Sequence, residues 1–346
     1  MDFGKLRDIL RPFLVHSSAQ DEKIYFSDSK YTAIPFNDAH FHPIPKESPA
    51  SSLAFIDGGQ CELLKSSHFS LQCIRVCAVI YKNNIRTHFE REEFYVLISV
   101  KLDNGRLRYE TTFFGNPLHL QESFLFELED ATLRQGIHKV PVSRIGEAVR
   151  RFAELKMAEK TAGELQNGDA VVLDGDLRSS MTHESMLFDA LYRRAKEKCV
   201  AVSGFCKAST LLTDKGNSWN NFLRKKSKLA KWYYHPAAAI ESPVHPAEMY
   251  FLKLNESSPY IFRFEACKHN ASQVGIVISL LAENAADPVF QGYPYGLIEA
   301  DQWARISRQE EISLKTQLQA YLGKDEILAE EARHDEDAHS VLDAIR

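Results

Sequence analysis

The sequence of 346 residues contains no long hydrophobic run. Its longest apolar stretch, residues 274–282, is far shorter than the ~20 residues that a membrane-spanning helix needs. The N-terminal residues carry charges within their apolar pattern, so a secretory signal peptide is not expected. We therefore expect a soluble, cytoplasmic protein with no membrane partner.

Cysteine and glycine motifs are also scarce. No two of the six cysteines have the Cys-x-x-Cys spacing, so neither a zinc ribbon nor a thioredoxin-type site is expected. The Gly-x-x-x-x-Gly-Lys-Ser/Thr and Gly-x-Gly-x-x-Gly loops of nucleotide sites do not occur. The chain therefore does not resemble an ATPase or a dinucleotide-dependent enzyme.

The net charge of −5 is distributed unevenly. Residues 325–343 hold eight acidic residues and one arginine, so the rest of the chain is close to neutral. Steering of a charged partner depends on local patches more than on total charge. This balance is therefore compatible with an anionic partner.

Hydrophobic periodicity predicts the order of the elements. An amphipathic helix is expected over residues 1–20, followed by an irregular segment over 27–50. Three strands in hairpin connection follow near 51–60, 71–81 and 92–102, the first ended by Asp57-Gly58-Gly59. The third runs through the hairpin signal Asp103-Asn104-Gly105 into residues 106–114.

The pattern then changes to alternating helices and strands. Helices are expected over 141–166 and 184–197, each followed by a strand, at 169–177 and 200–209. Later candidates are strands at 248–254 and 260–267, and helices near 271–284 and from Leu297 onward. An antiparallel meander followed by β-α-β crossovers predicts an α/β fold, a mixed sheet flanked by helices.

Two strands of this sheet end in an aspartate followed by glycine. Asp57 follows the first strand, and Asp174 follows the strand at 169–177. A turn-forming aspartate is the simple interpretation of each one alone. However, open sheets bind ligands at the carboxyl ends of neighbouring strands, and paired carboxylates need a cation between them. Together they indicate a Mg²⁺ or Mn²⁺ site.

Further ligands must come from helices. Glu154 lies in the helix before the second aspartate and could border its sheet-facing side, although a solvated glutamate is the default and Glu147 and Glu164 are competitors. Asp301 lies in the expected first turn of the C-terminal helix, together with Glu299. Acids there are also favoured by the helix dipole alone, so capping is the alternative for Asp301.

Cations and aromatic residues indicate where an anionic partner would bind. Lys207 closes the strand at 200–209, as either an edge charge or a phosphate contact. Six cations without an acid between residues 215 and 231 alternate with aromatic residues, which suits single-stranded nucleic acid, although a solvated basic helix is the alternative. The expected DNA-binding residues are Lys215, Trp219, Arg224, Lys225, Lys226, Lys228, Lys231, Trp232 and Tyr233.

The order of the acids, strand Asp, helix Glu, strand Asp and last-helix acid, resembles that of the ribonuclease H-like nucleases. More specifically, the chain is similar to the NurA family of nucleases. The similarity extends over most of the chain and rests on FIDGG at 55–59, FAELKMA at 152–158, VVLDGDL at 171–177, SGFCKAS at 203–209, WYYHP at 232–236 and GYPYGLIEAD at 292–301.

This resemblance implies a metal-dependent DNA nuclease of the single-strand endonuclease and 5′–3′ exonuclease type. It implies that Asp57, Glu154 and Asp174 are metal carboxylates and that Tyr293 is an active-site tyrosine. Asp301 stands where the family usually has histidine, and it would complete a site for two Mn²⁺ or Mg²⁺ ions. Lys207 would offset charge on the scissile phosphate.

The resemblance also implies partners and a division of the chain. The family acts in DNA end processing or repair as a homodimer docked on a HerA-type hexameric translocase. A ribonuclease H-like nuclease domain is expected over 51–322, with an N-terminal helix and irregular segment over 1–50 and an acidic C-terminal helix or tail over 323–346.

Two alternatives belong to other classes. His40 and His42 imitate the His-x-His metal motif of amidohydrolase barrels, although no apolar strand precedes them and prolines follow. The other alternative is a non-catalytic DNA-binding subunit in which Asp301 marks decay of the site.

Overall fold

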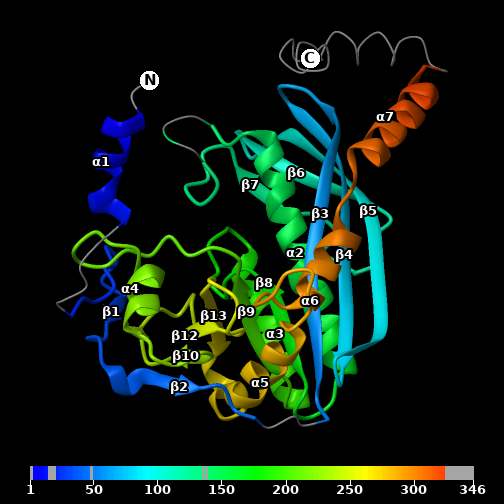
Figure 1. Ribbon diagram of the computed structural model, residues 1–346. Helices are drawn as coiled ribbons and strands as arrows, with labels where there is room; N and C mark the ends of the chain where they lie inside the picture. Colours follow the sequence, from blue (N-terminus) through cyan, green and yellow to red (C-terminus); the bar gives the residue numbers. More distant parts are fainter. Residues whose placement is uncertain (1–2, 15–20, 47–49, 135, 137–138, 324–346) are drawn as a thin grey trace.

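The computed structural model describes residues 3–14, 21–46, 50–134, 136 and 139–323. Its centre is an eleven-stranded mixed sheet with the order β2-β10-β12-β13-β9-β8-β3-β4-β5-β6-β7 (Figure 1). The strands are β2 (Phe41–Pro43), β3 (Ser52–Lys65), β4 (Phe69–Lys82), β5 (Ile85–Asp103), β6 (Arg106–Phe114), β7 (Leu125–Glu127), β8 (Ala170–Asp174), β9 (Ala201–Cys206), β10 (Trp232–Tyr234), β12 (Ala247–Lys253) and β13 (Phe262–Cys267).

The antiparallel meander is longer than the sequence predicts. β3 does not end at Asp57, because Gly58 and Gly59 stay extended and pair with Val76 and Arg75 of β4. The expected turn at this Asp-Gly-Gly is therefore wrong. The hairpin between β5 and β6 is confirmed, with Asn104 and Gly105 both at positive φ, as this tight turn requires.

The crossovers follow as expected. α2 (Val142–Glu164) leads into β8, and α3 (Glu184–Lys198) leads into β9. β8 runs parallel to both β3 and β9, whereas β13 is antiparallel to β9. The predicted mixed α/β sheet flanked by helices is therefore confirmed.

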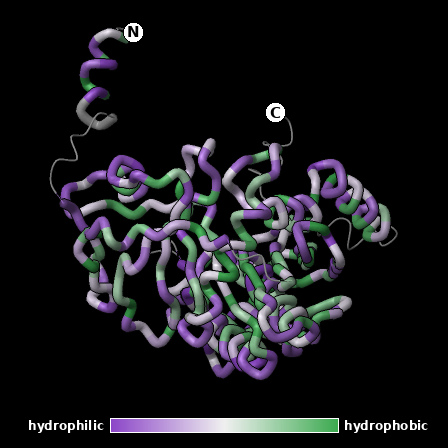
Figure 2. Tube along the Cα trace, turned by 60° about the horizontal axis from the view of Figure 1, so that its bottom comes forward, coloured by the Kyte–Doolittle hydropathy of each residue, from purple (hydrophilic) through white to green (hydrophobic). Residues whose placement is uncertain are grey.

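The middle of the sheet, around β3 and β8, is buried on both faces. Ala54 and Ile56 of β3 pack in the cluster that includes α2 and α3, and the alternating residues Leu53 and Phe55 pack in the cluster of the opposite face. That second face is covered by α5 (Val274–Asn284) and α6 (Tyr295–Ala304), so α2 and α6 lie on opposite sides of β3 and β4 (Figure 1). Figure 2 shows the hydrophobic stretches gathered in the interior.

The segment expected to be irregular, 27–50, contributes β2 to the edge of the sheet. It also contributes β1 (Tyr31–Ala33), which pairs with β11 (Ala238–Ile240). Near them, α4 (Trp219–Lys226) packs in a third hydrophobic cluster with β10 and β12. The N-terminal part of the chain is therefore tied to the residues around 210–250.

The terminal helices differ in their contacts. α1 (Phe3–Leu14) lies within the helix expected over 1–20, whose remaining residues lie outside the described ranges, and its Leu6, Ile9 and Leu10 are exposed. The expected C-terminal helix is two helices, because α6 ends at Ala304 and α7 (Arg308–Leu322) begins after a capping box at Ser307. Leu314 and Leu318 of α7 pack against the end of the meander.

The predicted acidic tail, beyond Gly323, lies outside the described residues. Within the described ranges, no helix is long and apolar enough to cross a membrane.

Candidate active site

Strand register places the two aspartates side by side. Ile56 of β3 pairs with Leu173 of the parallel strand β8, so Asp57 and Asp174, which follow these residues, are neighbours. Asp174 pairs in turn with Phe205 of β9, and Lys207 lies two residues further on. Residues two apart in a strand share a face of the sheet, so the side chains of Asp57, Asp174 and Lys207 all lie on the face that α6 covers.

The Lys207 ammonium lies between three carboxylates. Its Nζ is 2.6 Å from Oδ2 of Asp174, 3.6 Å from Oδ2 of Asp57 and 3.5 Å from Oδ1 of Asp301. Burial alone would lower the pKa of Lys207, but these carboxylates outweigh it, Asp174 most strongly, and raise the pKa. The structure therefore brings together four of the predicted site residues.

Asp57 is the most constrained of these acids. Its Oδ1 accepts a hydrogen bond from the Gly58 N–H at 2.8 Å, whereas its Oδ2 is buried without a hydrogen-bond partner. Burial raises the pKa of Asp57 to about 8, together with the negative charges of Asp174 and Glu154. One lysine therefore does not neutralise this group of acids, and a divalent cation would suit it.

Glu154 reaches the site from α2, on the opposite face of the sheet. A Cβ atom on Gly58 would lie 2.7 Å from its Oε1, so residue 58 must be glycine for the carboxylate to lie here. Glu154 is buried rather than solvated, with ion pairs to Arg150 and Arg151. Its competitors lie elsewhere, since Glu147 pairs with Arg144 and Glu164 is exposed.

The two arginines are functional candidates that the sequence analysis missed. Arg151 also pairs with Glu184 and donates to the backbone oxygens of Asp174 and Asp176, so it connects α2 to the end of β8. Arg150 donates to the Gly58 carbonyl at 3.2 Å. The only available signal was their i, i+3 and i, i+4 spacing from Glu154.

The two acids of α6 have different surroundings. α6 begins at Tyr295, so neither acid lies in its first turn, and the capping interpretation of Asp301 is wrong. Glu299 accepts a hydrogen bond from Tyr81 at 2.5 Å and pairs with Arg86, which makes it a structural link to β4 and β5. Asp301 instead faces Lys207, with Arg305 at 2.9 Å on its other oxygen.

Tyr293 lies just before α6, and it is buried with its hydroxyl unpartnered. Burial raises its pKa, as do the negative charges of Asp174, Asp57 and Asp301. The phenol therefore stays protonated and can donate a hydrogen bond to an anion at this site.

The basic segment matches its prediction only in part. Trp219 and Trp232 are 0% and 1% exposed in the cluster around α4, so they form the core and cannot stack on bases. Tyr233 is half-buried against His42, and Lys226 pairs with Asp21 above the ring of Phe36. The exposed cations are Lys215, Arg224, Lys225, Lys228 and Lys231.

The His-x-His alternative has no structural support. His40 ends a short 3-10 helix, and His42 lies in β2, where its Nε2 is 3.1 Å from the backbone oxygen of His235. β2 is an edge strand of an open sheet rather than part of a barrel. The amidohydrolase interpretation is therefore wrong.

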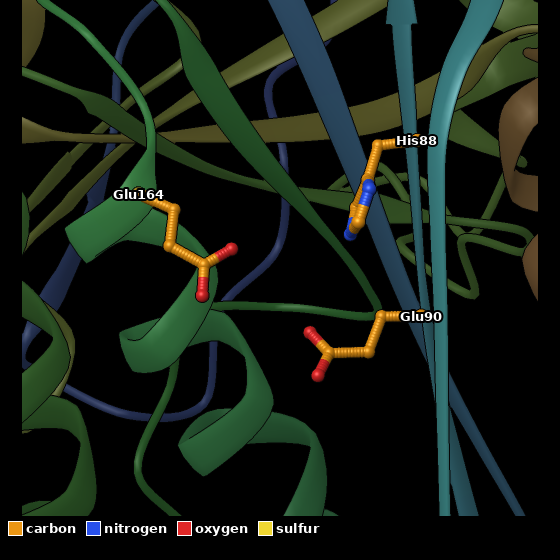
Figure 3. Close-up of side chains that lie close together, drawn as sticks. All are labelled: His88, Glu90 and Glu164. Carbon is orange, nitrogen blue, oxygen red and sulfur yellow. The ribbon is translucent and has the colours of Figure 1, made fainter.

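A separate group of metal-ligand types lies on β5 and α2. Figure 3 shows His88 and Glu90 pointing from β5 toward Glu164 at the end of α2. Across the described part of the chain, these three are the one such set whose ligand atoms all lie within 4.8 Å. Lys160 pairs with Glu90, and His88 and Glu164 are exposed, so we assign no ion here.

Solved structures of other proteins are similar to this one. The NurA nuclease from Sulfolobus solfataricus has a similar structure, with a TM-score of 0.52 and 11% identity over 93% of this chain and 95% of that chain. Human endonuclease V (catalytic domain) matches at a TM-score of 0.37 and 12% identity, over 82% and 92% of the two chains. No curated protein sequence matches.

The fold class expected from the sequence, a mixed α/β sheet flanked by helices, is therefore confirmed, and the fold is similar to that of a NurA nuclease. The NurA domain model matches residues 51–306, which is most of the chain and includes Asp57, Glu154, Asp174, Lys207, Tyr293 and Asp301. The chain belongs to the NurA family.

Proposed function

We propose that this protein is a metal-dependent DNA nuclease. The observation that carries the proposal is the group of three carboxylates around Lys207, in which the buried Oδ2 of Asp57 has no hydrogen-bond partner. Membership of the NurA family and the similar fold of a NurA nuclease support it. If the experiment below detected no cleavage with any metal, the non-catalytic alternative would hold instead.

The donor set suits hard divalent cations. Asp57, Glu154, Asp174 and Asp301 offer only oxygen ligands, which Mg²⁺ and Mn²⁺ prefer, and we propose that they hold two such ions. Bound ions of this kind lower the pKa of a water nucleophile and stabilise the charge on the attacking and leaving oxygens of a phosphodiester. Asp301 in place of histidine keeps the site free of nitrogen ligands.

The chain's own residues position the substrate. Lys207, held by Asp174, presents a positive charge at the opening of the site and offsets charge on the scissile phosphate. The protonated Tyr293 donates a hydrogen bond that orients the nucleotide. Arg150 and Arg151 hold the Glu154 carboxylate in place.

Partners and substrate preference extend the proposal. We propose single-strand endonuclease and 5′–3′ exonuclease activity in cytoplasmic DNA end processing or repair. The protein would act as a homodimer docked on a HerA-type hexameric translocase, with the strand guided by the exposed lysines of residues 215–231. The nuclease domain would comprise residues 51–322.

The test is cleavage of labelled single- and double-stranded DNA by the purified chain in Mn²⁺, Mg²⁺ or EDTA. We expect cleavage only with metal, and a fall of at least ~10²-fold for Asp57→Asn. Asp189→Asn, at an exposed position of α3, is the matched control and should be unaffected. Cleavage in EDTA, or none with any metal even with the translocase present, would refute the proposal.

A further inference from the structure

An apolar pocket opens next to the carboxylates. It has a volume of about 440 Å³, and Lys207 lines it together with Tyr260, Phe262, Val289, Phe290, Tyr293 and Ile298. Its walls come from the β12–β13 connection, residues 254–261, and the α5–α6 connection, residues 285–294. The lining includes no acidic side chain, although the acids of the site lie just beyond Lys207.

The aromatic rings of this pocket form two layers. Phe262 and Tyr293 are buried at its base, with ring centroids 5.4 Å apart. Tyr260 and Phe290 are stacked at its rim, with centroids 5.2 Å apart and an angle of 27° between the rings. These rim rings are 50% and 40% exposed, so they are not part of the core.

The two connections are packed on each other. Gly292 has a φ of +94°, and a Cβ atom there would lie 2.6 Å from Cβ of Ser258. The Gly292 N–H donates to the carbonyl of Ala285 at 2.8 Å, and the Tyr293 N–H donates to that of Phe290 at 3.2 Å. The rim is therefore held by close backbone packing, which makes the pocket a preformed site.

We propose that this pocket binds one unpaired base of a DNA strand whose neighbouring phosphate lies at the carboxylates. The inference rests on the proposed nuclease function and adds to it a binding site for the base, which requires a single strand or a frayed end. A flat apolar site with exposed rings suits base stacking, which tolerates every base because every base has a π-face.

Lys207 connects the two halves of this site. Its side chain lines the pocket, and its ammonium lies within 3.6 Å of carboxylates from β3, β8 and α6. A base in the pocket and its phosphate at the carboxylates are thus separated by the span of one lysine side chain. Bases within a duplex are covered by their neighbours and cannot enter, so the pocket selects against intact duplex.

The test measures coupling between a ring and a base. Short single strands carrying 2-aminopurine at successive positions are bound in EDTA to the Asp174→Asn protein, from which we expect no cleavage, and fluorescence quenching and Kd are recorded. We expect one position to be strongly quenched, and Phe290→Ala to abolish that quenching and weaken binding about 5- to 100-fold. Phe114→Ala, which removes a half-exposed ring from the far end of β6, is the matched control.

A strand with an abasic unit at the quenched position allows a double-mutant cycle between the ring of Phe290 and the base. The abasic unit should weaken binding to the protein that retains Phe290 as much as Phe290→Ala does. In the Phe290→Ala variant, the abasic unit should weaken binding little further. Phe290→Leu and Tyr260→Leu keep apolar bulk without a ring face and should also lose quenching, with melting temperatures close to that of the parent. The inference would be overturned by any of three results. These are additive losses of affinity from the abasic unit and Phe290→Ala, equal effects of Phe290→Ala and Phe114→Ala, or no binding at all.

The two proposals can fail separately. Metal-dependent cleavage without ring–base coupling would leave the nuclease function and remove the base pocket. Coupling without cleavage in any metal would leave the pocket and remove the nuclease function.

Discussion

A Cβ atom on Gly58 would lie 2.7 Å from Oε1 of Glu154, so the carboxylate occupies the space that a side chain at residue 58 would fill. Two elements from opposite faces of the sheet meet here. Glu154 belongs to α2, whereas Asp57, the residue before Gly58, faces α6. This glycine lets a carboxylate from one face act beside a carboxylate on the other.

Gly58→Ala should displace Glu154 and reduce metal-dependent cleavage by at least ~10-fold. Overpacking against the buried Glu154 side chain should also cost about 1–3 kcal/mol of stability. Turnover and melting temperature are measured together. Gly163→Ala is the control. Gly163 lies in α2, the helix of Glu154, where an added Cβ atom would make only ordinary contacts, so this exchange should be neutral or slightly stabilising. Unchanged turnover in Gly58→Ala would show that Glu154 need not lie here.

Asp301→Asn should reduce cleavage by at least ~10²-fold if this residue holds an ion, with partial recovery at high Mn²⁺. Asp301→His should retain substantial activity with a stronger preference for Mn²⁺, because imidazole suits softer ions. If Asp301 serves only its exposed pair with Arg305, Asn should cost at most ~1 kcal/mol of stability and leave turnover unchanged. Glu299→Gln is the comparison, expected to lower the melting temperature without altering the Mn²⁺ response.

Exchange of Lys225 and Lys228 for alanine should weaken DNA binding. Both lysines are exposed, whereas Lys226 is used in packing and is left in place. For every phosphate that the protein no longer neutralises, the dependence of log Kd on log salt should flatten by ~0.7–0.9. The control replaces Lys65 and Lys82, exposed lysines at the ends of β3 and β4. An identical salt dependence in both double variants would mean that residues 215–231 form only a solvated face.

Glu265 should make stability depend on acid pH. This buried carboxylate lies 2.7 Å from His245 Nε2 and accepts the Leu177 N–H at 2.9 Å. Burial alone would raise the pKa of Glu265, but His245, Arg263 and the Leu177 N–H outweigh it and lower the pKa below 4.5. Because the folded pKa is the lower one, the stabilisation is present above about pH 4.5 and is lost as pH falls through the folded value.

Urea unfolding of Glu265→Gln across pH measures this contribution. We expect a loss on the order of 3 kcal/mol at pH 7, and a smaller difference from the parent below pH 4.5. Glu256→Gln, at an exposed position, should show neither effect. A pH-independent difference for Glu265→Gln would mean that its charge contributes nothing.

Much of the architecture follows from the sequence alone. Alternating apolar residues predict the meander, and the helix-strand order after it predicts parallel neighbours for the first strand. That order suffices to bring Asp57 and Asp174 together, because their strands lie side by side and both point the same way. The family motifs extend this expectation to Glu154 and Tyr293.

Tertiary structure decided the rest, because burial and close approach depend on residues far apart in the chain. Gly58 and Gly59 look like a turn locally, yet β4 keeps them extended, and Gly59 leaves room for the backbone of Ala304 in α6. Trp219 looks like a stacking residue beside lysines, yet its ring fills the core around α4. Only the folded chain places Tyr260 next to Phe290, since local periodicity does not indicate which loops will pack together.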